Sequence, residues 1–72
     1  MLHPVRLPAP TALDKLVRTE LACAATYEKA LSHVRDGSAR FVLRQNRRSH
    51  ASRATMLSHH VVLQGGTPSE SA

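Results

Sequence analysis

The sequence predicts an all-α protein built as an antiparallel two-helix hairpin. Apolar residues recur at alternating intervals of three and four over residues 12–35 and again over residues 38–64, which is the period of a helix with one apolar stripe. The break between these stretches, Asp36-Gly37-Ser38, is so short that the second helix must run back along the first. We therefore expect a helical hairpin over residues 11–64.

Length and composition limit how this hairpin is stabilised. A single core in a 72-residue chain supplies only about 3–5 kcal/mol. Cys23 is the only cysteine, which excludes an internal disulfide and favours a reducing, cytoplasmic location. No apolar run is long enough for a membrane span, and early prolines interrupt the region where an export signal would lie. Self-association or a bound ion remains as the additional source of stability.

The first helix is expected over residues 12–35. Residues 1–10 contain three prolines and predict a loosely held arm. Thr11 is the expected N-cap, and Asp14 stands three residues later, where a capping-box acid belongs. The following stripe keeps heptad spacing and consists of Leu13, Val17, Glu20, Ala24, Tyr27, Leu31 and Val34.

The second helix is expected over residues 38–64. Gly37 is predicted to end the first helix in the left-handed conformation, and Asp36 or Ser38 to cap the second. The stripe of the second helix consists of Leu43, Arg47, His50, Ala54, Leu57 and Val61. Gly65 is predicted to terminate this helix, leaving residues 65–72 as a polar tail or linker.

Two helices with one apolar stripe each cannot hide both stripes by packing on each other alone. A second hairpin is needed, either from another copy of the chain or from sequence that follows Ala72 in a longer four-helix protein. The simplest assembly is a homodimer that completes a four-helix bundle around a two-fold axis.

Polar residues on the two stripes define a candidate site at mid-height. Glu20 is costly to bury unless it is paired or binds a cation. Tyr27 follows it by seven residues and therefore reaches the same layer, and Arg47 and His50 occupy the matching layer of the second helix. The sequence thus predicts a polar network of these four residues.

The order of these residues resembles the first half of a ferritin-like four-helix bundle. In that superfamily the first helix carries a metal-binding Glu, often followed by Tyr seven residues later, and the second carries Glu-x-x-His. The stretch "LQGGTP" at residues 63–68 is also similar to the end of the second helix in a little-characterised bacterial branch. The resemblance implies that Glu20 and His50 match ligands of iron or another divalent metal.

Arg47 departs from this pattern, because it stands where the Glu of Glu-x-x-His belongs. Arginine cannot coordinate a metal, and its charge opposes a nearby cation. Three interpretations follow: Arg47 pairs with Glu20 in place of a metal, two copies hold one ion through Glu20 and His50, or both residues are ordinary surface and bundle residues. The first favours a non-catalytic structural or interaction protein that has no cofactor and is not an enzyme.

The charge distribution suggests a further alternative. Ten Lys and Arg residues oppose five Asp and Glu residues, and the segment from Ser38 to Arg53 holds five arginines without an acid. Arg40, Arg44 and Arg48 recur every four residues and form a basic stripe suited to nucleic acid. Tyr27 and Phe41 are the only aromatic residues, so the sequence does not favour binding by base stacking.

Overall fold

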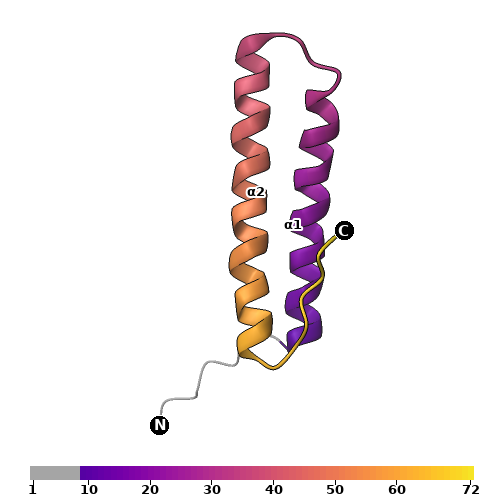
Figure 1. Ribbon diagram of the computed structural model, residues 1–72, viewed down its shortest axis with the longest axis vertical. Helices are drawn as coiled ribbons and strands as arrows, with labels where there is room; N and C mark the ends of the chain where they lie inside the picture. Colours follow the sequence, from indigo (N-terminus) through magenta and orange to yellow (C-terminus); the bar gives the residue numbers. More distant parts are fainter. Residues whose placement is uncertain (1–8) are drawn as a thin grey trace.

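The computed structural model describes residues 9–72, which form a hairpin of two helices (Figure 1). Helix α1 spans Pro10–Leu31, and helix α2 spans Gly37–Leu63. The two helices run side by side in opposite directions, and the chain after α2 turns back along α1. The predicted all-α antiparallel hairpin is confirmed, whereas nearly all of the predicted N-terminal arm lies outside the described residues.

Helix α1 begins without the predicted capping box. Ala9 is the N-cap residue, no side chain caps it, and Pro10 occupies the first helical position. Proline suits that position because its missing N–H group would have no intrahelical acceptor there. The predicted capping roles of Thr11 and Asp14 are therefore wrong, since both residues lie inside the helix.

The end of α1 also differs from the expectation. The helix stops at Leu31, four residues before the predicted Arg35. Arg40 of α2 donates from Nη1 to the carbonyl oxygens of Leu31 at 2.5 Å and Val34 at 2.8 Å. These bonds satisfy carbonyl groups that a helix C-terminus leaves without partners, so this arginine closes the turn.

Helix α2 begins as the sequence predicts, at a side-chain cap. The Asp36 carboxylate accepts a hydrogen bond from the Ala39 N–H at 2.9 Å. Gly37 is the first residue of α2, so the prediction that it ends the first helix in the left-handed conformation is wrong. Short-range capping therefore fixes this end of the turn, and no positive φ is needed there.

Helix α2 ends in a Schellman motif. Gly65 has a φ of 81°, as predicted, and its N–H donates to the Val62 carbonyl at 3.0 Å. The Gly66 N–H donates to the Val61 carbonyl at 2.9 Å. A Cβ atom on Gly66 would lie only 2.7 Å from the Pro10 Cβ, so the chain passes very close to the start of α1.

The tail beyond α2 is attached to α1 by hydrogen bonds. Ser69 donates its N–H to Asp14 Oδ1 at 2.7 Å and its hydroxyl to Oδ2 at 2.6 Å. These two bonds lower the pKa of Asp14, mainly because they stabilise the charged carboxylate. The segment expected as a polar tail or linker is thus a strap across the open end of the hairpin (Figure 1).

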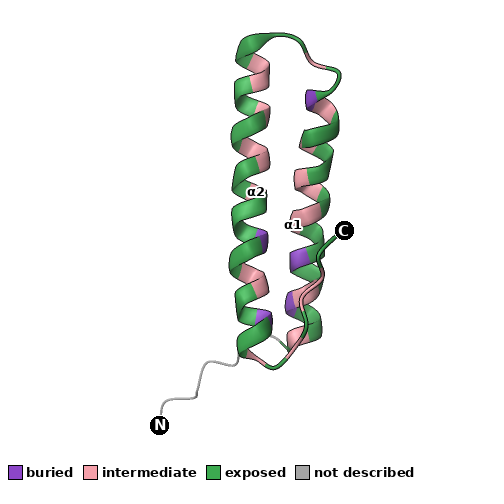
Figure 2. Cartoon of the chain, in the orientation of Figure 1, coloured by how far each residue is buried: buried purple, intermediate pink, exposed green. Residues whose placement is uncertain are grey.

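The buried residues lie on the facing sides of the helices and concentrate toward the open end (Figure 2). Those that are buried among residues 9–72 are Leu13, Val17, Leu31, Ala54 and Val61. All five belong to the stripes expected from the sequence. Leu21 and Leu57 pack partly buried against the cluster at the open end, so the core of the hairpin is small.

Much apolar surface remains exposed on the described part of the chain. The large apolar side chains that are 48–67% exposed are Leu16, Phe41, Val42, Met56, Val62 and Leu63. Neither α1 nor α2 is long and apolar enough to cross a membrane. Exposed apolar side chains that gather on one side of a protein commonly mark contact surfaces.

Candidate functional site

Glu20 and His50 meet at mid-height between the helices. His50 Nδ1 lies 2.5 Å from Glu20 Oε2, and the two side chains are 21% and 20% exposed. A carboxylate can only accept, so we assign the bridging proton to Nδ1. This bond lowers the pKa of Glu20 more than any other contact, because it stabilises the carboxylate; partial desolvation opposes the shift.

Arg53 is the second partner of Glu20. Its Nε donates to Glu20 Oε1 at 3.2 Å, and this contact also lowers the carboxyl pKa. Its Nη2 lies 2.9 Å from His50 Nδ1. Because the proton on that nitrogen is directed at Glu20, this proximity places a positive charge beside the ring and is not a second hydrogen bond. One carboxylate therefore holds two basic side chains.

The predicted ion pair between Arg47 and Glu20 is absent: in the described part of the chain, Glu20 pairs only with His50 and Arg53. The reason is rotational. Arg47 and Arg53 both stand three residues from His50, but on opposite flanks, about 60° to either side of it. Glu20 approaches on the Arg53 flank, so Arg47 is left without a hydrogen bond or ion pair to residues 9–72.

Tyr27 completes the polar layer, which we define as Glu20, Tyr27, His50 and Arg53. Its ring stacks on His50 with centroids 5.5 Å apart and planes inclined by 19°. The structure thus brings together three of the four predicted network residues and replaces the fourth. The stacked rings border an open hollow that is otherwise lined by the small α1 residues Thr19, Ala22, Cys23 and Thr26.

The polar layer of one chain does not fit a metal ion. Within residues 9–72, no group of three or more His, Cys, Asp and Glu side chains could hold one. Glu20 and His50 offer two donors, whereas a structural zinc site uses four. These two donors already bind each other, and Arg53 adds a positive charge beside them. A site for iron or another divalent metal would need donors from a second copy.

A second row of residues with heptad spacing flanks the buried stripe on each helix. On α1 this row consists of Ala12, Leu16, Thr19, Cys23, Thr26 and Ala30. On α2 it consists of Ser38, Val42, Gln45, Ser49, Ser52, Met56, His59 and Leu63. Neither row contains Asp, Glu, Lys or Arg, and most of these residues are exposed. The same spacing is present in the sequence, but these rows are less apolar than the buried stripes and so do not indicate burial.

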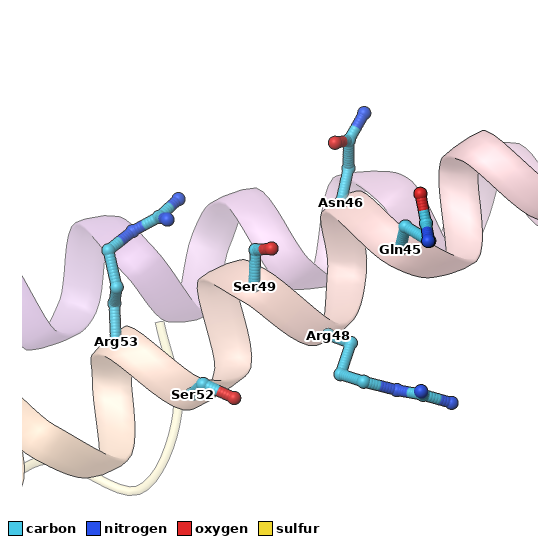
Figure 3. Close-up of a pocket in the computed structure, with 6 residues that line it drawn as sticks. All are labelled: Gln45, Asn46, Arg48, Ser49, Ser52 and Arg53. Atoms are coloured by element: carbon cyan, nitrogen blue, oxygen red, sulfur yellow. The ribbon is translucent and has the colours of Figure 1, made fainter.

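Both rows lie on one side of the hairpin, and together we call them the uncharged face. Each row is rotated in the same sense from its buried stripe, and helices that run in opposite directions bring such rows to the same side. Figure 3 shows the middle of the α2 row, where the short Ser49 and Ser52 side chains lie between the longer Asn46 and Arg53. The surface is therefore hollowed at the centre of this row, and Arg48 and Arg53 border the hollow.

The arginines of α2 lie beside this row, and Arg48 and Arg53 line the same hollow as Ser49 and Ser52. The expected basic stripe is divided, because Arg40 binds the carbonyl groups at the end of α1. Arg44 and Arg48 are exposed and Arg47 is half-buried, and we call these three the arginine cluster. Figure 3 shows Arg48 directed away from Arg53. The cluster is therefore separate from the polar layer.

No family model matches the chain, and neither does any curated protein or solved structure. The ferritin-like resemblance accordingly rests on sequence motifs and stays a prediction. The structure defines a small helical hairpin with an ion-paired polar layer, an uncharged row on each helix and a cluster of arginines on α2.

Proposed function

We propose that the protein is a non-catalytic structural module in which the uncharged faces of two copies pack together as a four-helix bundle. The observation that carries this proposal is the exposed, uncharged row that continues along both helices. This row also carries exposed apolar side chains, and apolar side chains that gather on one side of a soluble protein commonly mark a contact surface. The ferritin-like resemblance supports the same architecture, since it also implies a half bundle.

The apolar side chains on this face give association a driving force. Leu16, Val42, Met56 and Leu63 are 48%, 53%, 54% and 67% exposed. Completing the burial of a half-exposed side chain of this size yields about 1 kcal/mol. Four such residues per chain give a gain comparable with the roughly 3–5 kcal/mol that one small core supplies.

The small residues of the face give association its geometry. Thr19 and Cys23 on α1 and Ser49 and Ser52 on α2 leave the surface low between longer neighbours. Side chains of an approaching helix can fill such grooves, which sets interaxial distances of about 8–10 Å. The polar layer borders this contact, where Arg53 compensates the charge of Glu20 without a metal.

Two exposed residues allow a matched test. Met56 lies on the uncharged face and is 54% exposed, whereas Val62 lies on the other side of α2 and is 56% exposed. Met56→Lys would place a charge inside the proposed contact and should weaken dimerisation by at least about 100-fold, the effect of roughly 2.7 kcal/mol. Val62→Lys should leave the dimer unchanged.

Sedimentation equilibrium over a concentration series, with native mass spectrometry on the same samples, measures both effects. The wild-type chain should sediment as a dimer, and its mass should include no bound ion. A wild-type monomer at high micromolar concentration would overturn the proposal. Equal weakening by the two substitutions would also overturn it, because the contact would then not be specific to the uncharged face.

A further inference from the structure

The arginines of α2 differ in what they contact. This 27-residue helix contains five arginines and no Asp or Glu. Arg40 binds carbonyl oxygens at the end of α1, and Arg53 binds Glu20. The arginine cluster, Arg44, Arg47 and Arg48, has no hydrogen bond or ion pair to any of residues 9–72. Contacts within the hairpin therefore account for Arg40 and Arg53, and the other three arginines have no partner among the described residues.

The three unused charges are close together. Residues at positions i, i+3 and i+4 are neighbours on one helix face and are spread over about 6 Å along the axis. Glu28 of α1 lies on the same side of the hairpin but pairs with none of them in the described structure. The cluster thus presents three guanidinium groups on a rigid helix without an internal counter-charge.

We propose that the arginine cluster binds the phosphate backbone of a nucleic-acid duplex. Guanidinium stays charged at any physiological pH, and its forked donors match phosphate oxygens. The row of charges on a straight helix suits the regular phosphates of a duplex. Nothing on this face reads bases, so binding is independent of sequence and is governed by counterion release.

Two other anionic partners fit the surface less well. Single strands are held largely by stacking on aromatic rings; Tyr27 is stacked on His50, which leaves Phe41 as the one aromatic side chain near the cluster in residues 9–72. A helix that lies in a lipid interface needs a strongly apolar side opposite its charges. The middle of α2 lacks such a side, because the row beside the cluster there consists of Ser and Gln residues, namely Gln45, Ser49 and Ser52.

The proposal predicts a defined salt dependence. Three phosphate contacts correspond to a slope of about −2.7 in a plot of log K against log salt concentration, at about 0.9 per contact. Fluorescence anisotropy with a labelled mixed-sequence DNA duplex of about 20 base pairs, at roughly 50–200 mM NaCl, measures this slope. The full chain is used in this measurement.

The test compares two triple variants that remove the same charge. Arg44→Gln, Arg47→Gln and Arg48→Gln together should lower duplex affinity by at least about 10-fold at low salt and flatten the slope toward zero. Glutamine keeps helix propensity close to that of arginine, and circular dichroism checks the fold. The control replaces Lys15, Lys29 and Arg35 by Gln and should cost less than about 3-fold, because it removes only long-range attraction.

The outcomes of this comparison either support or overturn duplex binding by the arginine cluster. A selective loss in the arginine-cluster variant supports the site, as does weaker binding to a single strand of equal length. Equal losses in the two triple variants would overturn it, since net charge alone would then explain binding. Binding to vesicles containing phosphatidylserine but not to the duplex would assign the surface to lipid, and no duplex binding at low salt would exclude the proposal.

Discussion

Val17→Ala tests how much the buried cluster of the hairpin contributes to its stability. Val17 is 0% exposed and lies in the cluster at the open end of the hairpin, against Val61, which is 1% exposed. The substitution removes two carbon atoms from this cluster and leaves the helix backbone intact. Val62→Ala is the matched control, because it makes the same chemical change where the side chain is 56% exposed.

The expected effect follows from the buried volume. Two methylene equivalents at about 0.8 kcal/mol each give about 1.6 kcal/mol of lost transfer free energy. A cavity that stays open would increase this loss to about 2–2.5 kcal/mol. Partial collapse of this small hairpin around Val17 should remove part of the cavity. We therefore expect the free energy of unfolding to fall by about 2 kcal/mol, roughly half of what a small core supplies. Val62→Ala should cost less than about 0.5 kcal/mol.

Thermal unfolding followed by far-ultraviolet circular dichroism measures the difference. A loss of about 2 kcal/mol should lower Tm by roughly 8–16 °C in a domain of this size. Protein concentration must be the same for each variant, because dimerisation makes Tm depend on concentration. Equal Tm shifts for Val17→Ala and Val62→Ala would refute the reasoning, since the core would then lie elsewhere.

Three further outcomes follow from the structure. Arg53→Gln should raise the pKa of Glu20 toward its ordinary value of 4.5, whereas Arg47→Gln should leave it unchanged, as NMR titration of the side-chain carboxyl carbon will show. Because the folded-state pKa is lowered, the Glu20 contacts stabilise the fold above pH 4.5 and are lost as the pH falls through the folded value, so the urea midpoint should decrease there. Gly65→Ala should cost about 1 kcal/mol at its φ of 81°, while Gly37→Ala, with open space around it and no positive φ, should be nearly neutral; equal urea midpoints would contradict this.

The fold could be predicted from the sequence because helical periodicity reports directly which side of a helix is buried. Val17, Ala54 and Val61 all fall on the expected stripes. The start of α1 was missed because Pro10 suits the first helical position, which moved the boundary ahead of the Thr11 cap. The partner of Asp14 could not be read locally, since Ser69 is 55 residues away.

Three of the four residues of the polar layer were predicted from the same helical periodicity. Heptad spacing places Glu20 and Tyr27 on one face of α1, about 10 Å apart along the axis, and His50 of α2 contacts both. Spacing does not specify how the two helices are rotated about their axes. That rotation decides between Arg47 and Arg53, which are equally distant from His50 in sequence, and it emerges only from packing.

The strap from Ser69 to Asp14 changes where the molecule opens first. A simple hairpin frays at its free ends, because nothing there joins one helix to the other. Here the ends of both helices are tied, by the turn at one side and by the strap at the other. Local opening is therefore directed to the stretch between the turn and the polar layer, and amide hydrogen exchange should be slower around Val61 than around Arg47.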